Sequence, residues 1–318
     1  MKVLVTGGAG FIGSNISGKL LSDPRVTHVR VLDNLATGSM DNIKEYMDNP
    51  GFEFVKGDIR DYETCLQACD GMDVITHQAA LGSVPRSIND PVTSNNVNVT
   101  GTLHMFTAAK EKGIKRLVYA ASSSTYGDHP GLPKVEDKIG NPLSPYAVTK
   151  YVNELYARVY ASLYGMELIG LRYFNIFGPK QNPRGPYAAV IPLFAEALLK
   201  NEAPTINGDG MHSRDFTYVD NAVEANILSL FTTNKEAVNQ VYNIACGEQT
   251  SLLELFEGLR KEAGTSLQPV FGPERLGDVK HSLADISKAT SLLGYAAKVP
   301  VSTGLRQTFK WYKDHFNK

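Results

Sequence analysis

A glycine-rich turn near the start of the chain limits most strongly what this sequence can fold into. The apolar run 2–6 leads into Gly7-Gly8-Ala9-Gly10-Phe11-Ile12-Gly13, and a helical pattern follows. Gly7, Gly10 and Gly13 allow a tight turn, close approach of the backbone to a pyrophosphate, and close packing of helix on strand. The helix N-terminus would offer its N–H groups and positive dipole end to the phosphates. The turn therefore predicts a dinucleotide-binding strand–turn–helix unit.

The rest of the first half repeats this alternation of apolar strands and helical patterns. It predicts an α/β fold with a doubly wound, mostly parallel sheet and helices on both faces. The expected strands are 2–6, 29–32, 52–55, 73–76, 117–120 and 167–171, and the clearest helices are 95–112 and 145–164. A loop rich in proline and glycine then begins at position 179. We expect a dinucleotide-binding domain over 1–178, to which 215–239 return, and a smaller α/β substrate-binding domain over 179–214 and 240–318.

Residues at the ends of the predicted strands indicate which dinucleotide binds. Asp33 ends the second strand 20 positions after Gly13. A carboxylate at that distance accepts hydrogen bonds from the adenosine ribose and repels a 2′-phosphate, which favours NAD over NADP. Asp58 ends the third strand, where it can meet the adenine edge. Gln78-Ala79-Ala80 ends the fourth with small residues, leaving room for the cofactor at the carboxyl edge of the sheet.

A tyrosine and a lysine four positions apart predict the acid–base machinery. Tyr146 and Lys150 would share one face of the helix 145–164. A free tyrosine titrates near pH ~10, and an adjacent ammonium group would lower that pKa toward neutrality. Ser122 lies in the serine run that closes the fifth strand, where its hydroxyl can hydrogen-bond the same substrate oxygen. This arrangement is typical of proton transfer coupled to hydride transfer.

These motifs together resemble the extended short-chain dehydrogenase/reductase family, with its Rossmann sheet, over essentially the whole chain. The nearest likeness within it is to UDP-glucose and UDP-N-acetylglucosamine 4-epimerases. The resemblance implies that Tyr146 takes the proton of the C4 hydroxyl while the C4 hydride passes to NAD. The transient 4-keto sugar then rotates and presents its other face. NADH returns the hydride to that face, and Tyr146 returns the proton. The matching segments are 6–13, Asp33-Asn34, Asp58-Ile59, 121–127, Ser144-Pro145-Tyr146, Lys150 and Arg172-Tyr173-Phe174-Asn175.

The resemblance also implies which further residues line the site. Ser282 would take the position that gates the sugar pocket, where a bulky aromatic excludes an N-acetyl group. A UDP-N-acetylhexosamine is therefore the expected substrate. The cofactor positions are Gly7, Gly10, Phe11, Ile12, Gly13, Asp33, Asn34, Asp58, Ile59, Gln78, Ala79, Ala80, Asn98, Tyr146, Lys150 and Tyr173. The substrate positions are Gly82, Ser83, Ser122, Ser123, Ser124, Tyr146, Asn175, Ala189, Val190, Asn207, Arg214, Arg275, Asp278 and Ser282.

Three other functions compete with the interpretation as a 4-epimerase. A 4,6-dehydratase needs an acidic pair after the catalytic hydroxyl, but Ser123 and Ser124 stand there. A UDP-glucuronate 4-epimerase or decarboxylase would want a fixed cation near C5; Arg184 is available, although its loop position favours a solvated charge. A dinucleotide-binding sensor without chemistry would not need Tyr146, Lys150 and Ser122 together. The last two alternatives stay open.

Composition and residue placement narrow the possible partners. The formal net charge of −1 favours neither nucleic acid nor an acidic membrane surface. Cys65 and Cys69 are expected in the core, and His77, His129, His212 and His281 form no metal-binding pattern, so structural or surface roles are expected. With no signal-like start and no spanning apolar run, we expect a cytoplasmic protein. The family resemblance implies a homodimer through helices near 95–112 and 145–164.

Overall fold

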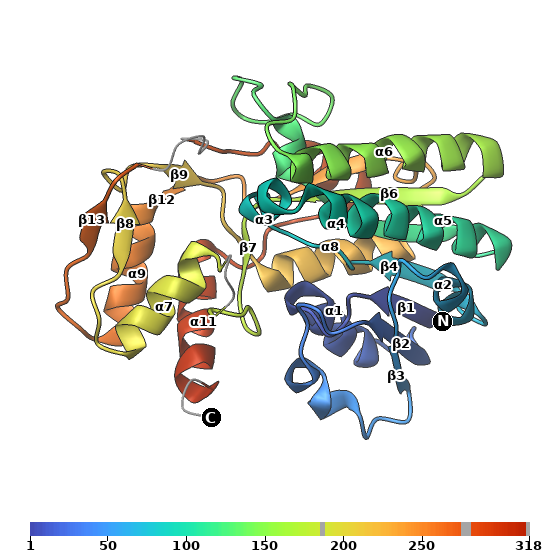
Figure 1. The fold of residues 1–318 in the computed structure, drawn as a ribbon, viewed down its shortest axis with the longest axis horizontal. Coiled ribbons are helices and arrows are strands. Elements are labelled where there is room, and N and C mark those ends of the chain that lie inside the picture. Colours follow the sequence, from blue (N-terminus) through green and yellow to red (C-terminus); the bar gives the residue numbers. More distant parts are fainter. Residues whose placement is uncertain (185–187, 275–280, 316–318) are drawn as a thin grey trace.

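A parallel sheet forms the centre of the computed structural model, which describes residues 1–184, 188–274 and 281–315 (Figure 1). The chain runs outward from β1 in one direction and from β4 in the other. The order therefore reverses between them and opens a crevice at the carboxyl ends of the strands. The predicted fold class is confirmed. The seven strands lie in the order β11 (Val241–Ile244), β6 (Glu167–Tyr173), β5 (Arg116–Ser122), β4 (Val74–His77), β1 (Lys2–Thr6), β2 (His28–Asp33) and β3 (Phe52–Lys56).

Helices cover both faces of this sheet (Figure 1). Side chains alternate along a strand, so Val3 and Val5 of β1 join one core cluster and Leu4 joins the other. The first face carries α1 (Phe11–Leu21) and α8 (Val219–Phe231). The second carries α2 (Tyr62–Cys69), α5 (Thr102–Glu111) and α6 (Pro145–Tyr164). Cys65 and Cys69 of α2 are fully buried there, as expected.

Two helices near the crevice show how local sequence sets their bounds. The helix predicted at 145–164 is α6, capped by the Ser144 hydroxyl, with proline at its first position and Gly165 in the left-handed conformation after its end. The helix predicted at 95–112 is instead three consecutive pieces. These are α4 (Pro91–Asn95), a π-helical turn η3 (Asn96–Gly101) and α5. Such turns commonly redirect a side chain at a functional site, and this one carries Asn98.

A smaller part of the molecule stands beside the carboxyl edge of the sheet (Figure 1). Its strands pair as β8 with β13 and β9 with β12, and its helix α9 packs against both α7 and α11. The chain enters it through β7, which pairs with β10. The elements are β7 (Ile176–Phe177), α7 (Val190–Leu199), β8 (Thr205–Asn207), β9 (Ser213–Arg214), β10 (Thr217–Tyr218), β12 (Thr250–Ser251), α9 (Leu252–Ala263), β13 (Val270–Gly272) and α11 (Val301–His315). The helix α10 (Ser287–Leu293) packs instead against β11 and α8.

Strand β11 belongs to the main sheet, although the predicted boundary puts it in the smaller domain. The sequence predicts that 240–318 belong to the smaller domain, but β11 pairs with β6 and extends the main sheet. Its four residues carry no local signal for this pairing, which depends on contacts distant in the sequence. The remaining short elements are α3 (Val84–Asn89), η1 (Met40–Asn42), η2 (Lys44–Tyr46) and η4 (Ser123–Tyr126). No helix in the described ranges is long and apolar enough to cross a bilayer.

Candidate active site

The glycine turn forms a tight cradle between β1 and α1. Gly7 has a φ of +67°, and a Cβ there would lie 2.7 Å from the backbone nitrogen of Ala79. A Cβ at Gly13 would lie 2.2 Å from the carbonyl oxygen of Gly7, so neither position tolerates a side chain. Gly10 precedes α1, whose first N–H groups face the crevice. The cradle thus has the close backbone and the dipole that a pyrophosphate requires.

One cavity of about 610 Å³ runs along the carboxyl ends of the strands, from this cradle to α6. Segments distant in the sequence meet there because β1, β2, β4, β5 and β6 all end at the same edge. Most of the predicted cofactor and catalytic residues therefore share one enclosure. They are Gly7, Gly10, Phe11, Ile12, Gly13, Asp33, Asn34, Asp58, Ile59, Gln78, Ala79, Ala80, Ser122, Tyr146, Lys150 and Tyr173.

The two acidic residues at one end of this cavity have different partners. Asp33 accepts hydrogen bonds from the N–H of Ala9 at 3.0 Å and of Leu35 at 2.8 Å. Burial raises the pKa of Asp33, and these backbone bonds oppose the shift. Asp58 is paired with Arg60, whose hydrogen bonds hold the pKa of that carboxyl well below its usual range. Each Asp33 oxygen keeps a second lone pair, so the carboxylate can still accept ribose hydroxyls.

Tyr146 and Lys150 lie on the first turns of α6 and face the end of β5. The Lys150 ammonium donates to the carbonyl oxygen of Ala120 at 2.8 Å, which leaves two N–H groups for a ligand. Ser122 ends β5 and hydrogen-bonds the Tyr146 side chain. Ser122, Tyr146 and Lys150 therefore all line the same cavity.

The electrostatics of this group differ from the prediction. Burial raises the pKa of the Tyr146 hydroxyl, and the hydrogen bond to Ser122 opposes only part of the shift. Burial also lowers the pKa of Lys150 to about 8. The expected lowering of the tyrosine pKa is therefore wrong for the protein alone, because desolvation by burial outweighs the hydrogen bond to Ser122.

A second cavity of about 640 Å³ adjoins the first on the side of the smaller part. Asn175, Ile176 and Gln181 line both cavities, so a ligand in the second can reach toward Tyr146. Arg214 on β9 supplies a cation to its wall. The predicted substrate residues that line it are Asn175, Ala189, Val190, Asn207 and Arg214.

Small residues line part of the wall of the first cavity. Gly82, Ser83 and Ser123 line the first cavity, and a Cβ built on Gly82 would have no neighbour within 4 Å. Ser83 has a φ of +125°, which an L-residue rarely adopts, and its hydroxyl caps α3 by accepting from the N–H of Arg86. Strained backbone of this kind gathers at ligand sites, where the surroundings hold it in place.

Several predicted site residues do not line either cavity. Asn98 is fully buried behind the first cavity, where its amide bonds both backbone groups of Leu81 and so positions that wall from behind. Ser124 donates to the Ser122 hydroxyl at 2.9 Å and so supports it indirectly. Ser282 accepts from the N–H of Asp215 at 3.4 Å, next to Arg214. The predicted contacts Arg275 and Asp278 lie outside the described residues.

The sequence prediction also missed residues that do line the cavities. Gln181 touches both, and His212 lines the second, where only structural or surface roles had been expected for the histidines. The signal for His212 was its spacing of two from Arg214, because alternate residues of an extended segment face the same side. For Gln181 the sequence held no such signal. Within the described part of the chain, no group of three or more His, Cys, Asp or Glu side chains could hold a metal ion.

The fold and site define an NAD-dependent enzyme of the short-chain dehydrogenase/reductase type. The chain belongs to the NAD dependent epimerase/dehydratase family, whose model matches residues 3–245. NAD is its cofactor, and the residues at the cradle and at Asp33 fit that group. When bound, it would supply a hydride acceptor and donor.

Relatives of the chain cover nearly its full length. It is 39% identical to a putative UDP-glucose 4-epimerase of Methanocaldococcus jannaschii, over 98% of this chain and 99% of that protein. The UDP-N-acetylglucosamine 4-epimerase of Methanobrevibacter ruminantium, solved with UDP-N-acetylmuramic acid, superposes with a TM-score of 0.93 at 38% identity, covering 99% and 98%. A variant UDP-glucuronic acid 4-epimerase of Bacillus cereus, solved with a fluorinated UDP-glucuronic acid and NAD, gives 0.91 at 33%, covering 99% and 100%. These relatives share C4 inversion but differ in the sugar.

Proposed function

We propose that this protein inverts C4 of a UDP-N-acetylhexosamine and so interconverts UDP-GlcNAc and UDP-GalNAc, with UDP-glucose and UDP-galactose as poorer substrates. The observation that carries the proposal is the open wall at Gly82, in the same cavity as Tyr146 and Lys150. An N-acetyl group needs free volume beside the sugar ring. The small residues Gly82, Ser83 and Ser123 leave that volume.

The residues divide the chemical work as follows. Tyr146 takes the proton from the C4 hydroxyl and returns it after the sugar has turned, while Ser122 hydrogen-bonds the same oxygen. Lys150 holds its ammonium near the phenolate through Ala120. Arg214 and Asn207 in the second cavity are suited to the diphosphate and nucleotide, which anchor the substrate while its sugar rotates. No net oxidation results, so the protein has to retain its cofactor from one turnover to the next.

A uronate substrate is the nearest alternative, and one observation speaks against it. A C6 carboxylate would need a fixed cation, and Arg184 was the candidate. Its side chain is 68% exposed and lies 3.7 Å from Glu196, and it lines neither cavity. Arg184 is therefore better explained as a surface charge than as a carboxylate-binding group.

A comparison of substrates tests the proposed function directly. The purified protein is incubated with UDP-GlcNAc, without added reductant, and the products are resolved by NMR. We expect UDP-GalNAc to form and kcat/KM to be higher for the acetylated pair than for UDP-glucose and UDP-galactose. A higher kcat/KM for the non-acetylated pair, or for UDP-glucuronate, would reject the proposal.

A larger side chain at the proposed gate should lower kcat/KM for the acetylated UDP-hexoses more than for the non-acetylated ones. Ser282 lines neither cavity, but the family resemblance assigns its position to the sugar pocket. On that basis we expect Ser282→Tyr to lower kcat/KM for the acetylated pair by about tenfold or more. Turnover of UDP-glucose should change far less. The exposed Ser266→Tyr controls for the added ring at a position that the family resemblance does not assign to the sugar pocket. Equal loss on both sugar pairs would count against the gate.

The predicted homodimer has a matching surface. Exposed apolar side chains form a stripe on α6 and continue onto the neighbouring α3 and α4: Ile88, Val92, Val148, Leu155, Tyr156, Val159 and Leu163. We therefore place the second copy against α6 with α3 and α4, rather than against α5. Val159→Glu should convert the dimer to a monomer in light scattering, whereas Leu132→Glu, an exposed leucine elsewhere, should not. A dimer that persists in the first variant contradicts this assignment.

A further inference from the structure

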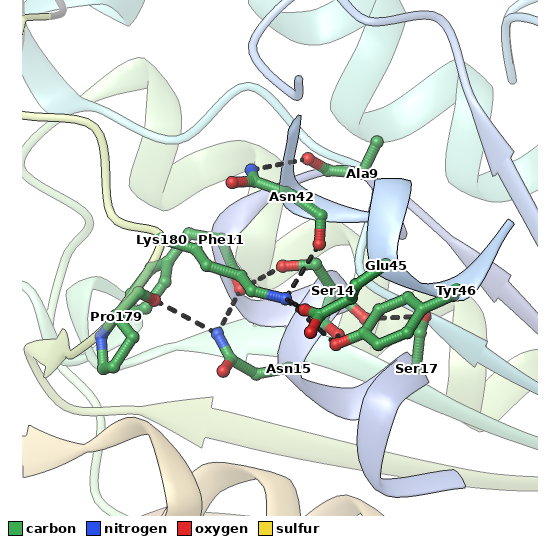
Figure 2. A network of polar contacts seen from close by, with 11 residues as sticks. Ala9, Phe11, Ser14, Asn15, Ser17, Asn42, Glu45, Tyr46, Pro179 and Lys180 are labelled. Carbon is green, nitrogen blue, oxygen red and sulfur yellow. Dashed lines mark hydrogen bonds and ion pairs between the residues drawn. The ribbon is translucent and has the colours of Figure 1, made fainter. Parts of the chain in front are cut away.

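Lys180 joins two segments that flank the first cavity (Figure 2). It follows β7, where the chain leaves the main sheet for the smaller part, and its backbone has a φ of +70°. Its side chain is 13% exposed and crosses to the segment 39–46. There the ammonium donates to the carbonyl oxygen of Asn42 at 2.8 Å, to Glu45 Oε1 at 2.7 Å and to the Tyr46 hydroxyl at 2.9 Å. All three donor positions of the ammonium are therefore used.

The segment reached by Lys180 is itself fastened to the start of α1. Asn42 donates to the carbonyl oxygen of Ala9 at 2.9 Å, and the Tyr46 hydroxyl donates to the carbonyl oxygen of Ser14 at 3.3 Å. Tyr46 also packs on α1 at Gly18, where a Cβ would lie 2.4 Å from the tyrosine hydroxyl. The Lys180 partners thus form one unit with the helix whose N-terminus faces the pyrophosphate cradle.

The other side of Lys180 is bound to the same helix and to the smaller part. Asn15 of α1 donates to the carbonyl oxygens of both Phe11 and Pro179, which places the loop 178–182 across the first turn of α1 (Figure 2). The next residue, Gln181, lines both cavities, and its carbonyl accepts from the Tyr312 hydroxyl of α11. One short stretch of chain therefore connects α11, the boundary of the two cavities and the cofactor cradle.

The positive charge of Lys180 and the negative charge of Glu45 compensate each other in this contact. Partial burial alone would raise the pKa of Glu45, but the hydrogen bond and charge of Lys180 bring it below its ordinary value. The Lys180 ammonium also lies 4.8 Å from the centre of the Tyr46 ring. A charged hydrogen bond, two neutral acceptors and a ring face on one ammonium form a stronger contact than an ordinary surface ion pair.

We propose that Lys180 is a positioning residue that fastens the loop 178–182 over the first turn of α1 and thereby keeps NAD bound between turnovers. The reaction restores the oxidised cofactor only if the same molecule stays in place. A protein of this kind therefore benefits from slow cofactor release, which is separate from proton transfer at Tyr146. The inference depends on the cofactor site but not on which sugar is the substrate.

The release of NAD measures this role without relying on turnover of the sugar. Holoenzyme is mixed with excess ethanol and alcohol dehydrogenase, which reduce each NAD molecule as it leaves and report it by absorbance. We expect Lys180→Met to release NAD about tenfold faster or more, since one charged and two neutral hydrogen bonds are lost. Lys180→Arg, which keeps the charge, should restore most of the slow release.

Controls distinguish this role from a general loss of stability. Lys44→Met removes a neighbouring exposed lysine that pairs with Asp41, and it should leave release unchanged. Glu45→Gln should speed release by a smaller factor, and combining it with Lys180→Met should add little, because both changes remove the same contact. Unchanged release in Lys180→Met, or equal acceleration in Lys44→Met, overturns the proposal. If Lys180→Met does not fold, Glu45→Gln and Tyr46→Phe decide it, and unchanged release in both overturns it.

Discussion

Tyr146→Phe is expected to lower kcat for C4 inversion by about 10²–10⁴-fold while the protein keeps its fold and its NAD. The change removes only the hydroxyl oxygen that is proposed to exchange a proton with the substrate. The aromatic ring, its packing and the backbone bond from Tyr146 N–H to Ser87 stay in place. Turnover is measured by NMR on the UDP-sugar, and the cofactor is quantified after release from denatured protein.

Tyr151→Phe is the matched control, because Tyr151 lies on the same helix but lines neither cavity. It should turn over at close to the normal rate. The comparison also addresses a dinucleotide sensor, the alternative that needs no chemistry. A Tyr146→Phe protein with near-normal turnover would remove the tyrosine from the mechanism, and a wild-type protein that binds NAD without converting any UDP-hexose would favour the sensor.

Parts of the fold that depend on neighbouring residues were predictable from the sequence. The turn at Gly7, Gly10 and Gly13 is local. A Cβ at any of these glycines would come too close to backbone atoms nearby in the chain or at the end of the adjoining strand. The same holds for α6, whose first cap and first position are set by Ser144 and Pro145. Parallel strands that end at one edge then bring Asp33 and Tyr146 to the same cavity without any further signal.

Parts that depend on contacts across the molecule were not predictable. The π-helical segment directs the Asn98 side chain toward Leu81 and away from the cavity. A helical pattern in the sequence does not reveal this direction. The pKa of Tyr146 depends on how completely the surroundings exclude water, and no spacing in the sequence reports this. Gln181 and Lys180 sit in a loop rich in proline and glycine, a composition that does not indicate which side chains make contacts. Only the crossing of α1 by this loop gives the two residues a role.

A buried ion pair behind the active site is a further contact of this non-local kind. Arg172 on β6 and Glu154 on α6 form two hydrogen bonds of 2.9 and 2.7 Å, with side chains 1% and 0% exposed. Burial alone would lower the pKa of Arg172, but hydrogen bonding to Glu154 raises it above its ordinary value. Glu154 lies one helical turn after Lys150, so the pair fixes α6 against β6 close to the catalytic residues.

Removing one charge of this pair should be the most destabilising of the substitutions considered. Glu154→Gln is expected to lower the free energy of unfolding by about 3–5 kcal/mol, because it leaves the guanidinium buried without a counter-charge. Chemical denaturation of the NAD-free protein measures the loss. Glu224→Gln breaks the exposed pair with Lys298 and should change stability by about 1 kcal/mol or less. Equal losses in the two variants would contradict this account.

Replacing both charges separates the cost of an unpaired charge from the value of the pair. Arg172→Met combined with Glu154→Leu buries no charge, so it should be more stable than Glu154→Gln alone, even though it also loses the bond from Arg172 to the Glu136 carbonyl. If stability recovers but turnover does not, the pair serves mainly to hold α6 in the position that catalysis requires. If neither recovers, the contacts of Arg172 with Glu136 and with the ring of Tyr126, 4.8 Å away, contribute more than its charge partner.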